Sequence, residues 1–265
     1  MSKKLRRILI IICTLVFLAC GGYVVKTKLP YWINEINNRK AADEYTEKND
    51  PIGPSSSVDD SIFDSKLIAP LKVDFKALKA VNNDVIGWIY CEDTAINYPV
   101  LQGETDESYI HTNYKGESNF AGAIFAEAQN LRDFKDNNTI LYGHNMYDGS
   151  MFACLSNWQV QDFMDKHPII WILTPEQDYC VEVFSAYITH ANNLDVYAIY
   201  RGTGSELSSY IKRVRSYSYV SSSIELDESG KYILLSTCTN AEGDLRSVVH
   251  GLMVPADSAA GIMKE

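Results

Sequence analysis

The sequence predicts a mainly β domain, a closed barrel or a sandwich, behind an apolar N-terminal extension. Eight short segments rich in β-branched and aromatic residues alternate with turn residues between residues 87 and 254. That pattern is typical of closed barrels and sandwiches. The chain of 265 residues, 46% of them hydrophobic, can bury one full core and still carry appendages. We therefore expect one folded domain with extensions.

The N-terminus has the pattern of a membrane anchor. Lys3, Lys4, Arg6 and Arg7 precede an uncharged, largely apolar run from Ile8 to Val25 that is just long enough to span a bilayer. Cationic residues before such a run predict a cytoplasmic N-terminus and an extracellular remainder. A cleaved signal peptide, or a lipid on Cys20, is the alternative, but no small-x-small cleavage signal stands out. A retained single-pass anchor is the prediction.

Four regions follow from these patterns. Residues 1–28 form a cytoplasmic tail and transmembrane anchor, 29–72 a stalk helix and linker, 73–256 the folded domain and 257–265 a C-terminal tail. The stalk helix is expected from Pro30 to Lys48, because good helix formers dominate there. The stretch from Asn49 to Ser61 holds two prolines and a serine triplet, so we expect no packed element in it.

The elements of the domain are expected in a fixed order. Apolar residues at Val73, Leu78 and Val81 have nearly helical spacing. The expected strands lie between turn residues, at Gly87–Tyr90, Ile96–Leu101 (interrupted by Pro99), Gly122–Phe125, Thr139–Tyr142, Ile169–Leu173, Tyr179–Thr189, Tyr232–Thr237 and Ser247–Val254. Helical segments are expected at Asp106–His111, Ser150–Trp158, Gln161–Lys166 and Glu206–Tyr217, with Ser150 and Ser205 as N-caps.

Charge and cysteine usage exclude several classes of protein. A net charge of -10 argues against a nucleic-acid partner, since phosphate binding needs a cationic surface. No Cys-x-x-Cys pair or His-Glu-x-x-His motif occurs, so neither a metal nor another cofactor is expected. Cys13 and Cys20 lie in the anchor, which leaves Cys91, Cys154, Cys180 and Cys238 outside it. Four cysteines in so large a domain do not indicate a disulfide scaffold.

Two expected strand ends each carry a reactive side chain. The strand ending at Tyr142 continues into Gly143-His144-Asn145, and the strand from Tyr232 runs into Cys238, with Arg246 eight residues later. A thiol becomes a useful nucleophile beside a base or a cation. Each residue alone has a structural alternative, a buried core cysteine or a surface salt bridge. In this order, however, the three indicate nucleophilic catalysis by a cysteine.

The motifs around these residues resemble those of class B sortases, membrane-anchored cysteine transpeptidases of Gram-positive bacteria. The shared motifs are Asn83-Asp84-Val85-Ile86-Gly87-Trp88-Ile89, Asn97-Tyr98-Pro99-Val100-Leu101-Gln102, Tyr142-Gly143-His144-Asn145-Met146, Leu234-Leu235-Ser236-Thr237-Cys238 and Arg246-Ser247-Val248-Val249-His250-Gly251. Leu234 departs from the family's Thr-Leu-x-Thr-Cys signature. The resemblance implies a closed eight-stranded barrel with N-terminal helices. It also implies a helix-bearing insertion between strands six and seven, here Ala191 to Lys231 with its helix at Ser205–Tyr217.

The resemblance also implies a reaction. Cys238 attacks the backbone carbonyl of a sorting motif in a secreted protein, His144 is the general acid and base, and Arg246 stabilises the oxyanion. An amine of a peptidoglycan precursor, or a lysine of a pilin subunit, then resolves the thioester.

By the same resemblance, substrate contacts fall to Tyr142, Ser236, Thr237, Asp106 and Ile110. The family commonly has asparagine where Asp106 stands and leucine where Ile110 stands. Asp106 adds a negative charge to a groove that otherwise binds a neutral polar motif, so the sorting sequence itself is not predicted.

Several alternatives stay open. A pilin-polymerising sortase and a cell-wall cysteine hydrolase share the nucleophile, although such hydrolases usually place the cysteine before the histidine. A surface binding module with a buried Cys238 is the non-enzymatic alternative. His250 is the rival base, but its apolar strand favours a packed imidazole, and the rival arginines Arg201 and Arg213 lie in the expected insertion.

Overall fold

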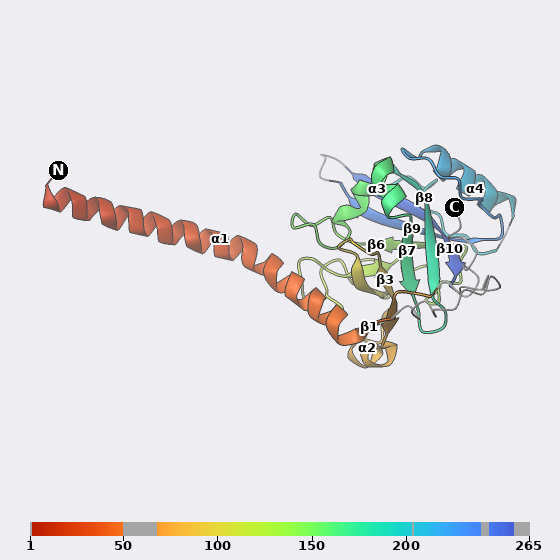
Figure 1. The fold of residues 1–265 in the computed structure, drawn as a ribbon, viewed down its shortest axis with the longest axis horizontal. Coiled ribbons are helices and arrows are strands. Elements are labelled where there is room, and N and C mark those ends of the chain that lie inside the picture. The colour runs from red at the N-terminus through yellow and green to blue at the C-terminus, as the bar shows by residue number, and fades with distance from the viewer. Residues whose placement is uncertain (1, 50–67, 203, 240–243, 257–265) are drawn as a thin grey trace, which may run out of the picture. The chain divides into compact units, whose positions relative to one another are not determined.

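The computed structural model describes residues 2–49, 68–202, 204–239 and 244–256 (Figure 1). It contains two compact units, Met1–Lys40 and Ala41–Glu265. Most of the expected linker, from Asn49 to Ser61, and the expected tail at 257–265 lie outside the described residues.

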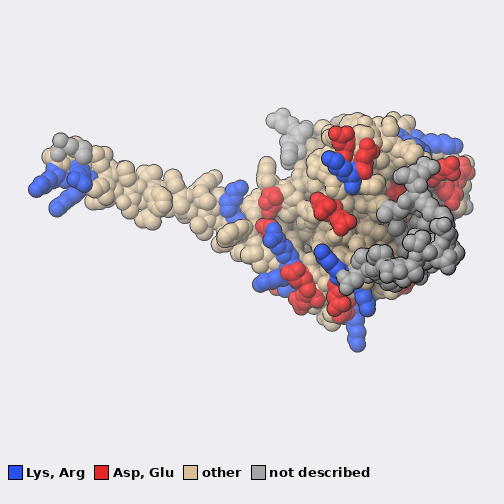
Figure 2. All heavy atoms as spheres, in the orientation of Figure 1, with Lys and Arg blue, Asp and Glu red and all other residues tan. Residues whose placement is uncertain are grey.

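The first helix, α1 (Lys3–Tyr45), joins the expected anchor and stalk without a break and contains Pro30. Within the described residues, it is the helix long and apolar enough to cross a membrane. Its first turns carry the cluster of lysine and arginine side chains at the N-terminal tip in Figure 2, whereas both signs of charge mix on the visible face of the domain. The stalk helix ends three residues earlier than expected, because Thr46–Lys48 forms a short strand, β1.

A closed barrel of eight strands forms the domain, as the resemblance implied. In chain order the strands are β3 (Val85–Tyr90), β4 (Asn97–Leu101), β5 (Ile124–Ala126), β6 (Asn138–Tyr142), β7 (Ile169–Leu173), β8 (Tyr179–His190), β9 (Lys231–Cys238) and β10 (Leu245–Pro255). Around the barrel the order is β10-β8-β7-β3-β4-β5-β6-β9. Every expected strand corresponds to one of these, and Pro99 pairs with Trp88 inside β4 rather than interrupting it.

Two strand pairs of the barrel are parallel, and one of them places two strand ends at the same edge. The β4–β5 and β6–β9 pairs are parallel, and the other neighbouring pairs of the barrel are antiparallel. Because β6 and β9 run side by side in one direction, their carboxyl ends meet at the same edge of the barrel. The antiparallel partner β10 starts at that edge, so β6, which is distant in sequence, and the consecutive strands β9 and β10 bring their termini together there.

A small layer lies against the barrel outside the ring of strands. β1 pairs with β2 (Leu71–Val73), and α2 (Phe75–Val81) follows, with Asp74 capping it by accepting from the Ala77 N–H at 2.9 Å. Ala41 and Tyr45 are buried in the same core cluster as Leu78. The expected start of the folded domain at residue 73 stays a prediction, but side chains from residue 41 onward belong to its core.

The helical connections differ from expectation in two places. α3 (Gln161–Lys166) lies where expected, but Ala153–Gln159 is a 3-10 helix, η1, whose N-cap is Phe152 rather than Ser150. Asp106–His111, expected as a helical segment, consists of turns. Its Asp106 side chain accepts the backbone N–H of Ala128 at 2.7 Å instead of capping a helix.

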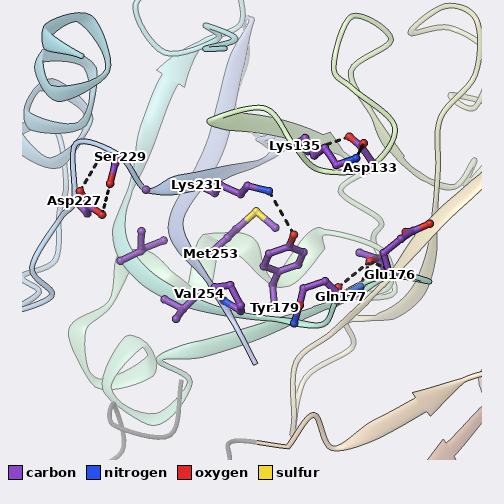
Figure 3. Close-up of a pocket in the computed structure, with 14 residues that line it drawn as sticks. Asp133, Lys135, Glu176, Gln177, Tyr179, Asp227, Ser229, Lys231, Met253 and Val254 are labelled. Atoms are coloured by element: carbon purple, nitrogen blue, oxygen red, sulfur yellow. Dashed lines mark hydrogen bonds and ion pairs between the residues drawn. The ribbon is translucent and has the colours of Figure 1, made fainter. Parts of the chain in front are cut away.

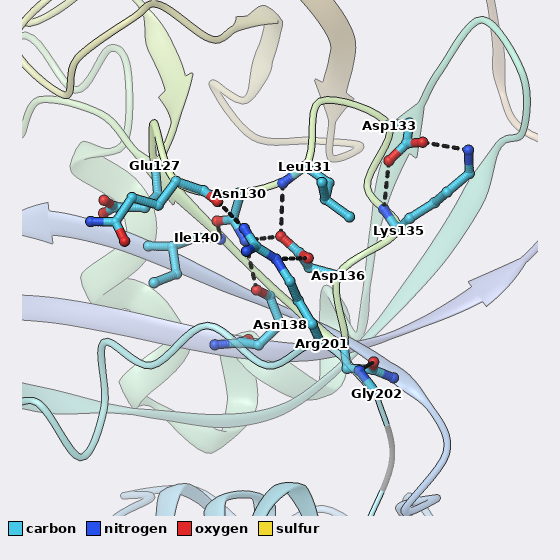
Figure 4. Close-up of polar contacts among 12 residues, drawn as sticks. Glu127, Asn130, Leu131, Asp133, Lys135, Asp136, Asn138, Ile140, Arg201 and Gly202 are labelled. Atoms are coloured by element: carbon cyan, nitrogen blue, oxygen red, sulfur yellow. Dashed lines mark hydrogen bonds and ion pairs between the residues drawn. The ribbon is translucent and has the colours of Figure 1, made fainter.

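The insertion lies between β8 and β9, the sixth and seventh barrel strands, and contains α4 (Ser205–Ser216). Gly204, not Ser205, occupies the N-cap position. The apolar face of α4 packs on barrel residues in one core cluster, which joins Leu207, Tyr210, Ile211 and Val214 to Phe184, Tyr187 and Val248. Figure 4 shows a second attachment, in which the guanidinium of Arg201 meets the Asp136 carboxylate of the β5–β6 loop at 2.9 Å.

Candidate active site

Strand register places the three expected catalytic residues at one level. In the parallel β6–β9 pair Tyr142 is opposite Ser236. His144 lies two residues after Tyr142 and Cys238 two residues after Ser236, so His144 and Cys238 are at the same level along the two strands. In the antiparallel pair Arg246 is directly opposite Cys238. Directly opposed residues carry their side chains on one face with Cβ atoms about 4.5–5.5 Å apart. The thiol therefore stands between the imidazole on one side and the guanidinium on the other.

A cavity of about 420 Å³ opens at this edge of the barrel. Its lining includes every residue proposed for the site from the sequence: Asp106, Ile110, Tyr142, His144, Ser236, Thr237, Cys238 and Arg246. Ser236 and Thr237 are only 2% and 3% exposed, so each adds little accessible surface to the wall. The cavity is also lined by four residues that were not predicted from the sequence: Phe125, Gly143, Ala191 and Tyr197.

The hydrogen bond of His144 fixes its tautomer. Its Nε2 lies 2.8 Å from the carbonyl oxygen of Ile110. A carbonyl oxygen only accepts, so Nε2 carries the hydrogen and Nδ1 is the nitrogen free to exchange a proton. The ring of His111 is stacked on that of His144, with centroids 5.6 Å apart. Gly143 before it is required sterically, because an added Cβ would lie 2.5 Å from Ile124 Cδ1.

Hydrogen bonds hold both Cys238 and Arg246 near the end of β9 and the start of β10. Cys238 is exposed, and its carbonyl oxygen accepts from Asn145 Nδ2 at 2.9 Å. Arg246 donates from Nη1 to the Leu245 carbonyl at 3.1 Å and from Nη2 to Asp244 at 3.3 Å. The guanidinium has five N–H donors in a rigid planar group, so the N–H groups that do not bind Leu245 or Asp244 can donate to an oxyanion.

The remaining cysteines are unlike Cys238. All described cysteines are free thiols. Burial raises the pKa of Cys91 and Cys180 to about 12 and that of Cys154 to about 11. These three thiols are therefore protonated at neutral pH. Such burial is typical of cysteines that fill a protein core.

The rival residues occupy other places. His250 is 1% exposed, shares a 3.0 Å hydrogen bond with the Tyr187 hydroxyl, and has its pKa lowered to about 3 by burial. A neutral imidazole buried between the barrel wall and α4 cannot serve as the base in the cavity. Arg201 and Arg213 pair with Asp136 and Asp195 instead.

Two aromatic residues and a serine form one wall of the cavity. Tyr142 and Tyr197 stack with centroids 6.3 Å apart, and the Tyr197 hydroxyl is 2.8 Å from Ser236 Oγ. Burial raises the pKa of both tyrosines, so both stay protonated and can donate hydrogen bonds. Tyr197 comes from the insertion, and the sequence offered no signal that would set it apart from its many tyrosines.

A larger cavity of about 620 Å³ lies at the opposite ends of β9 and β10 (Figure 3). Its lysines already have partners, since Lys135 pairs with Asp133 and Lys231 donates to the Tyr179 hydroxyl. No group of three potential metal ligands occurs in the part of the chain that the structure describes. The reactive side chains are thus gathered at the cavity that contains Cys238.

Comparison with known proteins agrees with this geometry. The sortase domain family matches residues 89–254. The chain belongs to the sortase family. Sortase B of Listeria monocytogenes is 36% identical over 184 residues, which are 68% of this chain and 74% of the relative. The expected class B sortase is confirmed, and with it a cysteine transpeptidase.

Two solved structures show the same fold. The Staphylococcus aureus sortase B-substrate complex matches with a TM-score of 0.65 at 31% identity, covering 68% of this chain and 84% of that one. A sortase B complexed with triglycine matches with a TM-score of 0.64 at 31% identity, covering 68% and 85%. The barrel described above is therefore the sortase B barrel.

Proposed function

We propose that this sortase cleaves a sorting motif through a thioester on Cys238. Nδ1 of His144 takes up the thiol proton of Cys238, and the sulfur attacks the scissile carbonyl while Arg246 stabilises the oxyanion. Nδ1 then gives that proton to the departing amine, which leaves the thioester on Cys238. An incoming amine then attacks the thioester, His144 takes up its proton, and the thiol is released. This proposal is supported by the strand register, which places Cys238 opposite Arg246 and level with His144.

The substrates are a secreted protein with a sorting motif and an amine of the cell-wall precursor. A relative with its substrate bound and another with triglycine support a peptide donor and an amine acceptor. We assign peptide contacts to Tyr142, Ser236, Thr237, Asp106 and Ile110. A pilin lysine as the acceptor remains an alternative. Water as the acceptor, in a hydrolase, is the alternative that the experiment below distinguishes.

The direct test is to trap the thioester. The chain from residue 41 onward is incubated with a panel of sorting-motif peptides and triglycine, and its mass is followed beside that of Cys238→Ala. We expect an adduct on Cys238 that passes to triglycine, and none on the variant. A folded protein that forms no adduct, with Cys238 resistant to small thiol reagents, would contradict the proposal. Product formation independent of the amine would favour hydrolysis.

The N-terminal helix anchors the protein with its N-terminus in the cytoplasm and the domain outside. The apolar part of α1 and the four cationic residues before it support this orientation. We expect the full chain to sediment with membranes and the chain lacking residues 1–40 to remain in solution. Protease added to intact cells should degrade the domain, and protection of the domain until the cells are lysed would reverse the orientation.

A further inference from the structure

A carboxyl pair lies behind the wall of the cavity. Glu127 directly follows β5, and its Oε2 accepts the Tyr142 hydroxyl hydrogen at 2.7 Å. The Glu127 carboxyl group is also hydrogen-bonded to that of Asp106, which lines the cavity. Glu127 itself does not line the cavity, so it can act on a bound peptide only through Asp106 and Tyr142.

The contact between the two carboxyl groups requires a proton. Two ionised carboxylates can only accept, so one of the pair must be protonated for them to bond. Asp106 accepts the Ala128 backbone N–H at 2.7 Å, so this side chain already acts as a hydrogen-bond acceptor. Burial raises the pKa of Glu127 to about 7, with Asp106 contributing in the same direction. Glu127 is thus the protonated partner, donating to Asp106 from one oxygen while accepting from Tyr142 on the other.

The surroundings of Glu127 hold the pair in place. The titratable groups that face it are Asp106 from the loop after β4 and Tyr142 from β6, with Tyr197 of the insertion behind Tyr142. The Glu127 carbonyl accepts from Gln102 Nε2 at 2.8 Å. Farther along the same loop Arg201 binds the Gln129 carbonyl and the Asp136 carboxylate, as Figure 4 shows. The loop that carries Glu127 is therefore fixed from both sides.

We propose that Glu127 is a positioning residue that, through a proton shared with Asp106, keeps a single negative charge at this end of the peptide groove. The groove then selects a peptide side chain that donates a hydrogen bond to Asp106, an amide, hydroxyl or ammonium group, and rejects a carboxylate. This inference rests on the proposed function. Loss of the shared proton places two carboxylates side by side, and their repulsion displaces Asp106 from the position that the peptide needs.

The test separates this ionisation from those of the catalytic residues. Peptides that acylate Cys238 are bound, with a fluorescent label, to Cys238→Ala and to Cys238→Ala combined with Glu127→Gln between pH 6 and 9. If only the singly protonated pair binds peptide, the dissociation constant of the single variant rises about tenfold per pH unit above pH 7. Glutamine keeps both hydrogen bonds without a proton to lose, so the dissociation constant of the double variant should change far less. Glu104→Gln, which removes an exposed carboxylate, is the matched control and should follow the single variant.

A second measurement needs no peptide. Carbon-13 NMR of glutamate and aspartate carboxyl groups should show one signal titrating near pH 7 that Glu127→Gln abolishes. Equal pH profiles with and without Glu127→Gln, or no carboxyl group titrating near pH 7, would overturn the inference. Absence of any acyl-enzyme would instead contradict the proposed function, and the NMR titration would still decide whether the pair shares a proton.

Discussion

At the scale of single residues, the site depends on groups whose geometry is imposed by main-chain partners. Ile110 supplies no side-chain chemistry, yet its carbonyl oxygen decides which nitrogen of His144 carries the hydrogen. Arg246 is held in the same way, by the Leu245 carbonyl. Such contacts pre-organise the side chains before the peptide arrives, so less reorganisation is needed as negative charge develops on the scissile carbonyl.

Arg246 cannot be replaced by lysine without loss. A lysine has one ammonium group and cannot both bind the Leu245 carbonyl and direct planar donors at the oxyanion. We expect Arg246→Lys to lower kcat/KM for transpeptidation by about 100-fold, the cost typical of a lost oxyanion donor. Arg213→Lys, in α4, is the control. A decrease equal to that of the control would show that Arg246 does not contact the transition state.

At the scale of elements, the insertion contributes to the cavity only because it is attached to the barrel. Tyr197 stands in the wall, and the segment around it is fixed by Arg201 on Asp136 and by Asn138 Nδ2 on the Ala198 carbonyl. The Asp136 side chain is fully buried and also accepts from Asn130 and from the Leu131 N–H. These contacts hold the segment around Tyr197 against the β5–β6 loop and against β6 itself.

Removal of the Arg201 side chain tests this attachment. We expect Arg201→Ala to cost about 2–3 kcal/mol of stability, since the hydrogen bonds to the buried Asp136 carboxylate and to the Gln129 carbonyl are both lost. Amide hydrogens between residues 191 and 202 should exchange faster, and KM for peptide should rise several-fold with kcat nearly unchanged. Lys212→Ala, on the exposed face of α4, should alter neither. Unchanged exchange in this segment would show that other contacts suffice to hold it.

The sequence predicted the long elements better than the short ones. The eight barrel strands were visible because their β-rich runs are bounded by turn residues. Thr46–Lys48 was assigned to the stalk helix, because a three-residue strand is stabilised by its partner rather than by local preference. Asp106 has helix formers around it, but its contact with Ala128, 22 residues away, replaced a local cap. The catalytic residues carried family motifs, whereas Tyr197 and Glu127 act through contacts that no local pattern encodes.

At the scale of the whole molecule, the barrel and the insertion together bury an imidazole that must stay neutral. The rings of Phe184, Tyr187 and Tyr210 surround His250. In the unfolded chain this histidine takes up a proton near pH 6.5, but in the barrel its pKa is about 3. Between these values the unfolded state binds more protons, so the free energy of unfolding decreases as the pH falls below 6.5.

Acid should therefore destabilise the domain through His250. One unit of pKa difference corresponds to about 1.4 kcal/mol, so we expect this group to cost about 2 kcal/mol between pH 7 and pH 5. Urea unfolding of the chain from residue 41 at pH 5, 6 and 7 measures the loss. His250→Gln should be less stable at pH 7 but should lack this part of the pH dependence, whereas His190→Gln, at an exposed site, should retain it. Identical slopes for both variants would contradict the assignment.

The parallel pairing of β6 with β9 also governs when the thiol becomes reactive. The two strands are separated by most of the domain's second half, and β10 comes later still. Pairings so distant in sequence form late, because the entropy of closing the loop must be lost before the contact is gained. In a chain exported from its N-terminal side onward, His144 emerges before Cys238 and Arg246. With the orientation and the catalytic roles proposed above, a partly exported molecule would carry an ordinary cysteine, and activity would begin only when the barrel closes.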